Sequence, residues 1–237
     1  AIIFKEYNFN FNHQSVKTHN VMFSSYPGCL ASNDDFYFTS KGLVVIETTN
    51  SNYNQSSYDL ITEESLLCWQ RVQLSNRMAE SAKEWTEIFS QYNSGTYNNQ
   101  YIILDTKNIE FGNYTKIKEN VLMIVEQVPG FLEVNDVSNH LKFGYWPSYN
   151  VPYGKNVSKY SNITNTINSK PERDMKLYNE YNSCSRANIM RRDQNKINDI
   201  ESMKKFMQYN DYLNDPFSNG NPGESIASRY DLRENRP

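Results

Sequence analysis

The chain has 237 residues and carries 24 basic and 27 acidic side chains, which give it a net charge of −3 at neutral pH. The basic residues are scattered and form no stripe that could neutralise a row of phosphates, so nucleic acid is excluded as a partner. The longest apolar segments, residues 42–46 and 121–128, are much shorter than the roughly 20 residues that span a bilayer, and no segment has the layout of a signal peptide.

The first elements in chain order are strands. Residues 21–26 form an apolar stretch that ends at the turn residues Pro27 and Gly28. Residues 36–39 and 43–49 are rich in aromatic and β-branched side chains and are separated by Ser-Lys-Gly, which predicts a hairpin. We expect these three strands to share one sheet.

A helical region follows the hairpin. Thr62 precedes two glutamates, and this pattern predicts a helix N-terminus, because threonine caps backbone N–H groups and carboxylates suit the positive end of the helix dipole. Good helix formers continue to about Phe89. A break at residues 75–76 or near Ser81 would divide the region into two helices.

Polar loops and further elements fill the second half of the chain. A polar loop at residues 92–100 leads directly into an apolar strand at residues 101–105, and a second apolar strand covers residues 121–128. Residues 144–170 predict irregular, extended chain, since they contain Pro, Gly, Ser and Asn with little periodicity. Apolar residues at three- and four-residue steps between residues 197 and 207 predict a helix that packs one stripe against a core.

Strands and helices come in blocks rather than in strict alternation. This order favours an α+β fold with a mainly antiparallel sheet.

Several common catalytic centres are excluded by their missing motifs. His13, His19 and His140 are the only histidines and lie in no HxxxH or HxxE arrangement, which argues against a zinc hydrolase. No GxSxG elbow or phosphate-binding glycine loop occurs, so we expect neither a metal nor a cofactor. Asp34 and Asp35 favour a solvated hairpin end over a catalytic pair, because neighbours on a strand face opposite ways.

The three cysteines, Cys29, Cys68 and Cys184, are widely spaced and form no CxxC motif. Their pairing is not assigned by the sequence. Cys29 directly follows a turn and could serve as a nucleophile, but no histidine lies beside it in the sequence, so a buried or idle thiol is the favoured interpretation.

Uncharged hydrogen-bond donors and one arginine near strand and loop ends form the remaining candidate site. Thr49, Asn150 and Arg186 could support a developing oxyanion or a substrate carboxyl or phosphate group without acting as nucleophiles. In the polar loop, Thr96, Asn98 and Asn99 are candidates for substrate binding, although small polar residues also make ordinary turns.

Blocks spread over the whole chain, in matching order, resemble the phospholipase B-like family. They are Phe-Ser-Ser-Tyr-Pro-Gly at 23–28, Asp-Asp-Phe-Tyr at 34–37, Glu-Thr-Thr at 47–49, Trp-Gln-Arg-Val at 69–72, the loop at 93–100, Glu-Gln-Val-Pro at 126–129, Tyr-Trp-Pro-Ser-Tyr-Asn-Val-Pro at 145–152 and Met-Gln-Tyr-Asn-Asp-Tyr at 207–212. The family is similar to N-terminal nucleophile (Ntn) hydrolases. The resemblance therefore implies an incomplete αββα sandwich of mainly antiparallel sheets, with residues 1–237 as a single domain fragment.

The resemblance also implies an activity and a location. The family is expected to hydrolyse amide or ester bonds, with phospholipid acyl esters among the candidates, so the expected partner is a lipid or acyl-amide substrate. It implies a lysosomal or secreted glycoprotein, for which the N-x-S/T sites at Asn54, Asn113, Asn156 and Asn162 are candidate glycosylation sites. In a chain this rich in asparagine, such triplets also arise by chance.

Three residues take roles from the resemblance. Asn150 would donate to an oxyanion, Arg186 would orient the site through charge-assisted hydrogen bonds, and Thr49 would line the pocket near the nucleophile. The alternatives are structural: Thr49 ends a strand, Asn150 caps a turn, and Arg186 pairs with a surface carboxylate.

The chain departs from the family pattern at both ends. The nucleophilic cysteine, with a histidine and a tryptophan after it, is expected upstream of Ala1. The residues that precede Phe23, beginning with residues 1–5, resemble the tail of the helix between them and the first strand. The family also continues beyond Pro237. We therefore expect an internal fragment that works with the remaining N-terminal and C-terminal parts of the same precursor and is inactive alone. The alternatives are an inactive lipid- or glycan-binding module of the same fold and an adhesive, structural glycoprotein.

Overall fold

A computed structural model of the chain describes residues 1–32, 36–110, 112–163 and 180–233. The chain divides into two compact units, residues 1–163 and 164–237, which are described separately below. The single domain expected for residues 1–237 stays a prediction.

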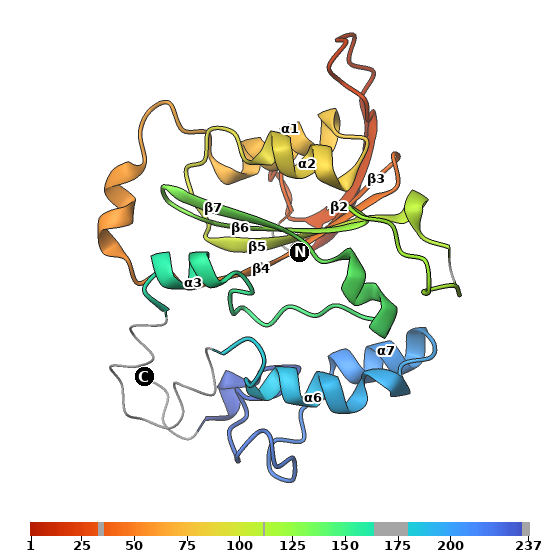
Figure 1. Cartoon of the computed structure of the whole chain (residues 1–237), viewed down its shortest axis with the longest axis vertical. Helices are drawn as coiled ribbons and strands as arrows, with labels where there is room; N and C mark the ends of the chain where they lie inside the picture. Colours follow the sequence, from red (N-terminus) through yellow and green to blue (C-terminus); the bar gives the residue numbers. More distant parts are fainter. Residues whose placement is uncertain (33–35, 111, 164–179, 234–237) are drawn as a thin grey trace. The chain divides into compact units, whose positions relative to one another are not determined.

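The first unit is built on one antiparallel sheet of seven strands that follow one another in chain order (Figure 1). The strands are β1 (Ile3–Asn8), β2 (Asn20–Ser25), β3 (Phe36–Thr39), β4 (Leu43–Thr49), β5 (Asn99–Asp105), β6 (Leu122–Val128) and β7 (Phe131–Asp136). The antiparallel α+β architecture and the β3–β4 hairpin are thereby confirmed.

Two helices, α1 (Cys68–Met78) and α2 (Ala82–Phe89), cover one face of the sheet (Figure 1). Trp85 and Phe89 of α2 are fully buried there and pack around Tyr101 of β5, with ring centroids about 5 Å apart. Strand β4 contributes to this core through Leu43 and Val45, because alternate strand residues face the same side.

The second face carries a smaller apolar cluster. Ile102, Leu122 and Ile124 are buried there, and the half-buried rings of Trp146 and Tyr153 pack against them from the chain that follows β7. This chain contains a short 3-10 helix at Ser138–Phe143 and α3 at Lys155–Tyr160. The unit therefore contains one sheet with covering chain on both faces, the incomplete form of the expected sandwich.

Two predictions at helix boundaries are wrong. The residues before Phe23, expected to form the tail of a helix, contain β1 and the start of β2, and β1 pairs with β2 along its full length. The helix expected from Thr62 begins only at Cys68, after Leu67, while the predicted break near Ser81 is confirmed. The Ser81 hydroxyl accepts a hydrogen bond from the Glu84 N–H and so caps α2.

The region expected to be irregular, residues 144–170, contains α3, which the sequence did not indicate. Its Val157 is buried, and the Val157 N–H donates to Glu133 of β7 at 2.8 Å. A tertiary partner thus completes the first turn of this six-residue helix. Residues 164–170 lie outside the described residues.

The second unit contains α6 (Ser185–Asp193) and α7 (Ile200–Met207). The apolar stripe predicted on α7 does not pack against a core: Ile200 is 74% exposed and Met207 53% exposed. The buried apolar side chains of the unit's described part lie on α6 and just before it, at Cys184, Ala187 and Ile189. Helical spacing predicted the helix correctly, but it carries no information on what the apolar side faces.

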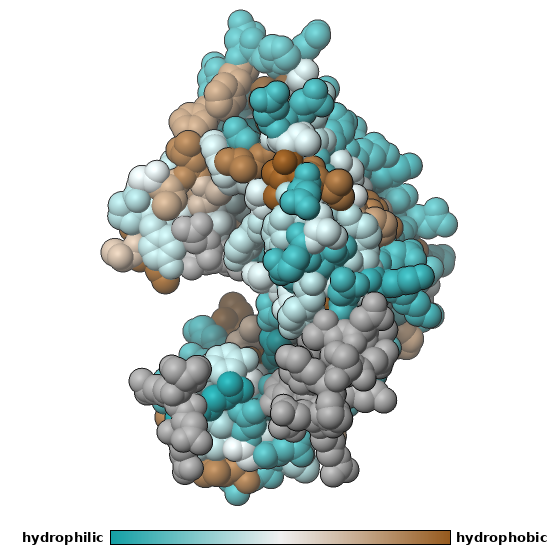
Figure 2. All heavy atoms as spheres, turned by 90° about the vertical axis from the view of Figure 1, so that its left-hand side faces the viewer, coloured by the Kyte–Doolittle hydropathy of each residue, from teal (hydrophilic) through white to brown (hydrophobic). Residues whose placement is uncertain are grey.

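The surface mixes apolar and hydrophilic residues. In the view of Figure 2, brown apolar residues lie among teal hydrophilic ones. Within the residues that the structure describes, no helix is both long and apolar enough to cross a membrane.

Candidate functional site

The predicted site residues of the first unit meet at one end of the three central strands. The register places Thr49 of β4 opposite Asn99 of β5, and Asn99 opposite Gln127 of β6. The polar loop at residues 92–98 enters β5 at this end. Side chains from the loop and from three strand ends therefore come together in space.

Asn150 lies at this same end, although it is 101 positions from Thr49 in the sequence. Its side-chain nitrogen donates to the Thr49 carbonyl oxygen at 2.9 Å. Asn150 is exposed and has a left-handed backbone, with φ at 60°, which asparagine tolerates better than most residues. The structure thus joins two of the three residues to which the resemblance gives roles.

The side chain of Thr49 points toward the polar loop. Its hydroxyl donates to the Tyr97 hydroxyl at 3.2 Å. Tyr97 has φ at 68°, an uncommon conformation for an aromatic residue, and its ring is about half exposed. Thr49 therefore does more than end a strand, because it fixes a loop residue that borders the cavity described below.

The three loop residues predicted to bind substrate have different surroundings. Thr96 lines the cavity, and its hydroxyl accepts a hydrogen bond from the Cys68 N–H at 3.2 Å. Asn98 lies beside the cavity-lining residues and donates to the Tyr58 hydroxyl at 3.2 Å. Asn99 is fully buried in β5 and accepts a hydrogen bond from Gln127 at 3.0 Å. Their binding roles stay predictions.

Arg186 belongs to the second unit, where it is half buried in the first turn of α6. Its positive charge works against the burial that raises the pKa of Cys184. Its role at the site stays a prediction. Asp34 and Asp35 lie outside the described residues.

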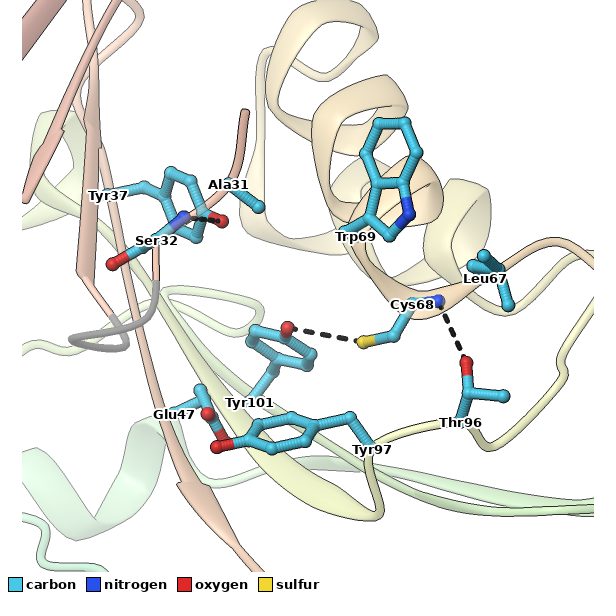
Figure 3. A pocket seen from close by; sticks show the side chains of 10 residues that line it. All are labelled: Ala31, Ser32, Tyr37, Glu47, Leu67, Cys68, Trp69, Thr96, Tyr97 and Tyr101. Carbon is cyan, nitrogen blue, oxygen red and sulfur yellow. Dashed lines mark hydrogen bonds between the residues drawn. The ribbon is translucent and has the colours of Figure 1, made fainter. Parts of the chain in front are cut away.

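A cavity of about 440 Å³ opens between the sheet and the N-terminal end of α1 (Figure 3). Its described lining residues come from β3, β4, β5, α1, the polar loop and the chain after β2. They are Ala31, Ser32, Tyr37, Glu47, Leu67, Cys68, Trp69, Thr96, Tyr97 and Tyr101. This volume lies within the range of about 300–1,000 Å³ that is typical of small-molecule sites.

The thiol of Cys68 lies in this cavity next to two polar groups. The Tyr101 hydroxyl is 3.4 Å from Sγ, and the side-chain amide of Gln127 donates to Sγ at 3.2 Å. Burial raises the pKa of the Cys68 thiol above its ordinary value, and the hydrogen bond from Tyr101 only partly offsets this effect. Cys68 is therefore a neutral thiol at neutral pH and not an activated nucleophile.

Gln127 is held by a buried arginine. Arg71 of α1 donates to the Gln127 side-chain oxygen at 2.5 Å and to Asn93 at 3.0 Å, and its guanidinium lies 4.1 Å from the centre of the Phe89 ring. Burial lowers the pKa of Arg71 to about 10, which leaves it charged at neutral pH. The guanidinium fixes the orientation of the Gln127 amide, which in turn donates to Cys68, Asn99 and the Tyr97 carbonyl.

Glu126 supports the Asn150 segment from the opposite face of the sheet. Its buried carboxylate accepts hydrogen bonds from the Tyr153 N–H at 2.8 Å and the Gly154 N–H at 2.5 Å. Gln100 donates to the same carboxylate at 2.7 Å. Glu126 thereby anchors the chain just after Asn150. A Cβ on Gly154 would lie 2.7 Å from the Glu126 carboxylate and closer still to that of Glu133.

The sequence reasoning missed Glu47, Tyr101 and Glu126 as site residues. A signal for Glu47 was present: it follows Leu43 and Val45 on the inward-facing side of β4, so strand alternation places a carboxylate in the core. Glu126 gave a similar signal, since it lies within the buried run of β6. Buried carboxylates on core faces are uncommon and usually have specific partners.

The histidines and potential metal ligands were also compared with the cavity. The cavity lining contains none of the three histidines among its described residues. Across the described ranges, no group of three or more His, Cys, Asp and Glu side chains is arranged to hold a metal ion.

The candidate glycosylation sites are at least partly accessible, and Asn156 is exposed. The amides of three sites donate to protein oxygens: Asn54 to Tyr160, Asn113 to Glu110, and Asn156 to Glu133. Their glycosylation stays a prediction.

Comparison with known proteins identifies the family of this chain. The model of the phospholipase B family matches residues 2–237. The chain belongs to the phospholipase B family.

Relatives in this family come from distant organisms. Phospholipase B-like 1 of Bos taurus is 43% identical over 235 residues, which cover 99% of this chain and 42% of the relative. Phospholipase-B 81 of Drysdalia coronoides is 44% identical over 97% of this chain and 40% of its own length. Phospholipase B-like protein B of Dictyostelium discoideum is 42% identical over 97% of this chain and 39% of its own length. The chain thus spans about two fifths of the length of these phospholipase B relatives.

Among solved structures, the chain has a partial likeness to a mutant of conjugated bile acid hydrolase from Clostridium perfringens. The TM-score is 0.37 with 18% identity, over 57% of this chain and 42% of that chain. A superposition this partial says nothing about the activity of the phospholipase B chain.

Proposed function

We propose that this chain is part of a hydrolase that acts on amide or ester bonds, with phospholipid acyl esters as the candidate substrates. In this proposal the chain supplies the substrate-side wall, and the nucleophilic cysteine comes from another part of the precursor. Membership in the phospholipase B family supports this reading, as do the names of its relatives.

The observation that carries the proposal is the pairing of Asn150 with Thr49. An exposed asparagine in a left-handed conformation is fixed by a hydrogen bond to a strand end far away in the sequence. Residues held in sparsely populated backbone conformations cluster at active sites, where a fixed donor can stabilise developing negative charge without reorganising. Asn150 is accordingly proposed as the oxyanion donor, Thr49 as a wall residue, and Arg186 as the group that orients the substrate.

The proposal is tested by Asn150→Ala in the full-length protein. The expected result is a fall in kcat of about 100- to 1,000-fold with little change in KM, because the lost donor acts mainly in the transition state. The measurement is steady-state hydrolysis of a chromogenic acyl ester and an acyl amide.

Asn120→Ala is the matched control, since Asn120 also has φ at 60° but lies beside the start of β6, at the other end of the sheet. Full activity in Asn150→Ala would remove Asn150 from the oxyanion site.

A second candidate function is that of an inactive module that binds lipid or glycan. It is favoured by the cavity itself, whose described lining contains one thiol, Cys68, and this thiol is kept neutral by burial. The hydrolysis assay distinguishes the two functions when it is combined with a binding measurement. An inactive module in the full-length protein binds acyl compounds saturably but does not hydrolyse them. A lysosomal or secreted location, with glycans on Asn54, Asn113, Asn156 and Asn162, is part of the first proposal and is checked by glycosidase treatment of the natural protein.

A further inference from the structure

A buried arginine contacts the polar loop that enters β5. Arg71 of α1 is 1% exposed, and burial lowers its pKa to about 10, so it is charged at neutral pH. Within the described residues its guanidinium donates to neutral oxygens only, namely the carbonyls of Phe89 and Gln91 and the side-chain amides of Asn93 and Gln127. Its charge is therefore met by dipoles and not by a carboxylate.

This arrangement is costly for a residue whose role is only structural. A buried charge without an opposite charge carries a desolvation penalty, which hydrogen bonds to neutral oxygens offset only in part. A guanidinium, however, has a property that amides and hydroxyls lack, because it donates hydrogen bonds and never accepts them. Each group that bonds to Arg71 must therefore present an oxygen, and this fixes the direction of each side-chain amide that the guanidinium contacts.

Gln127 of β6 is the first amide that is oriented in this way. Its oxygen accepts a hydrogen bond from Arg71 at 2.5 Å, so its nitrogen must point away from the guanidinium. That nitrogen donates to the Tyr97 carbonyl oxygen at 3.1 Å. In the reversed orientation two oxygens would face each other and repel. The direction that Arg71 imposes is thus the one that holds the loop.

Asn93, at the start of the loop, is the second amide. Its oxygen accepts hydrogen bonds from Arg71 at 3.0 Å and from the Gly95 N–H at 2.8 Å. Its nitrogen donates to the carbonyls of Val128 and Phe131 at 3.0 and 3.2 Å, which ties the loop to the turn between β6 and β7. The guanidinium therefore fixes the start of the loop as well as its end.

The loop passes these constraints on to the proposed site. Tyr97 has a left-handed backbone, with φ at 68°, and its hydroxyl accepts a hydrogen bond from the Thr49 hydroxyl. The carbonyl oxygen of Thr49 in turn accepts from the amide of Asn150. Figure 3 shows Thr96, the residue before Tyr97, bonded to the Cys68 N–H. A shift of the loop would displace the partner of Thr49 and disturb the strand end that holds Asn150.

We propose that Arg71 is a positioning residue. Through the amides of Gln127 and Asn93, it holds the polar loop in the geometry that the site around Thr49 and Asn150 requires. Because Arg71 is buried, it acts through these amides and does not itself contact the substrate. The hold on the loop is a property of the fold, whereas its effect on turnover rests on the proposed hydrolase function.

Two substitutions of Gln127 separate positioning from stability. Both Gln127→Glu and Gln127→Met remove the donor to the Tyr97 carbonyl, but only Gln127→Glu keeps an acceptor for Arg71 and adds a countercharge. Asn99, whose side-chain nitrogen has no hydrogen-bond partner among the described residues, can rotate to donate to the new carboxylate. Gln127→Glu should therefore unfold at a higher urea concentration than Gln127→Met.

The readout is steady-state hydrolysis by the two full-length variants, measured together with their urea unfolding. We expect kcat to fall about 10- to 100-fold in both, with a smaller change in KM, because both lose the geometry that the transition state needs. A role in stability alone would make turnover follow the urea midpoint. Wild-type kcat in Gln127→Glu would therefore overturn the proposal.

Arg77, which also lies on α1, provides the matched control. It is 8% exposed and, like Arg71, donates to backbone carbonyls, here those of Thr18 and His19. Arg71→Lys and Arg77→Lys should both reduce stability, since an ammonium group cannot reach all the acceptors of a guanidinium. Only Arg71→Lys should lower kcat, and equal kcat values for the two variants would overturn the proposal. If Arg71→Lys does not fold, the two Gln127 variants decide.

Hydrogen exchange tests the hold on the loop without reference to activity. The Thr96 N–H, which donates to the Ser94 hydroxyl at 3.2 Å, should exchange at least about tenfold faster in Gln127→Glu than in the wild type, and at the wild-type rate in Arg77→Lys. Mass spectrometry of peptides that cover residues 92–98 measures this. Unchanged exchange in Gln127→Glu would overturn the proposal. Faster exchange in a full-length protein that hydrolyses neither esters nor amides would leave the hold on the loop standing and overturn the proposed hydrolase.

Discussion

The two ends of the central strands β4, β5 and β6 differ in how completely their buried polar groups are satisfied. At the end that holds Thr49, here called the amide end, Asn50, Asn99 and Gln100 are each at most 3% exposed. Each nevertheless has one side-chain polar atom without a hydrogen-bond partner among the described residues. Each such atom carries a desolvation cost of about 1–3 kcal/mol.

The opposite end, here called the carboxylate end, is built from Asp105, Asp136 and Ser138. The Ser138 hydroxyl accepts hydrogen bonds from the Val121 and Leu122 N–H groups at 2.9 and 3.0 Å and lies against Asp136. The Asp105 carboxylate accepts hydrogen bonds from Lys107 and Asn108. One buried amide nitrogen without a described partner, in Asn135, occurs on the neighbouring edge strand.

This difference distinguishes a structural strand end from a functional one. At the carboxylate end, side chains accept hydrogen bonds from the backbone N–H groups, which stabilises the fold. The amide end keeps polar atoms that the fold does not use, beside Asn150, Thr49 and the aromatic cavity. Proteins tolerate such destabilising arrangements where binding or catalysis benefits from them.

Gly95 at the amide end gives the largest predicted effect on stability. Its φ is +57°, and a Cβ there would lie 2.0 Å from the Pro129 nitrogen and 2.3 Å from the Val128 carbonyl carbon. Backbone atoms cannot move aside easily, so Gly95→Ala should reduce the free energy of unfolding by about 3 kcal/mol or more, measured by urea denaturation.

Gly28→Ala is the matched control for Gly95→Ala. Gly28 also has a positive φ, at +80°, but a Cβ there meets nothing within 4 Å, so only the backbone strain of about 1–2 kcal/mol applies. Equal losses in both variants would mean that the loop does not pack tightly against the β6–β7 turn.

Removing one polar side chain from each end tests the comparison directly. Ser138→Ala leaves two buried N–H groups unsatisfied and should cost about 2 kcal/mol. Asn50→Ala removes a long hydrogen bond of 3.3 Å to Glu126 together with an acceptor that has no described partner, so its cost should be less than about 1 kcal/mol. A larger loss from Asn50→Ala than from Ser138→Ala in urea denaturation would reverse our assignment of the two ends.

The pH dependence of stability should have opposite signs at the two ends. At the carboxylate end, burial raises the pKa of Asp136, but hydrogen bonds from Ser138 and Asn120 outweigh it and hold the pKa below its ordinary value. Asp136 therefore contributes stability above about pH 4, and this contribution is lost as the pH falls through the folded-state pKa.

At the amide end the sign is reversed. Burial raises the pKa of Glu126 above its ordinary value despite hydrogen bonds from Gln100 and Gly154. Its favourable contribution is complete below about pH 4.3 and is lost as the pH rises through the folded-state pKa.

Urea unfolding between about pH 3 and pH 7 measures both effects. The stability of the wild type relative to Asp136→Asn should increase with pH, whereas its stability relative to Glu126→Gln should decrease. Each substitution also removes hydrogen bonds, and this changes the free energy of unfolding by an amount that does not depend on pH. The test therefore uses the slope of the stability difference against pH and not its absolute size. Parallel slopes for the two variants would contradict the proposed difference.

The sequence by itself determined the type and approximate position of most elements in the first unit. Strands β2 to β6 were predicted because aromatic and β-branched runs bounded by turn residues have a local cause. The break between α1 and α2 was predicted because Ser81 is a local N-cap. Thr49 and Asn150 were named as candidate site residues from the sequence, but the hydrogen bond between them is seen only in the structure.

Only the tertiary structure decided which polar residues act together. Glu47, Tyr101 and Trp69 are far apart in the chain and meet because the β4–β5 register and the packing of α1 bring them to one hollow. Likewise, the first turn of α3 is completed by Glu133 of β7, which accepts a hydrogen bond from the Val157 N–H. The apolar spacing of α7 did not indicate that its apolar side chains are exposed. Local sequence specifies backbone preference, but burial and partnership depend on contacts between distant segments, which a single sequence does not encode in any short pattern.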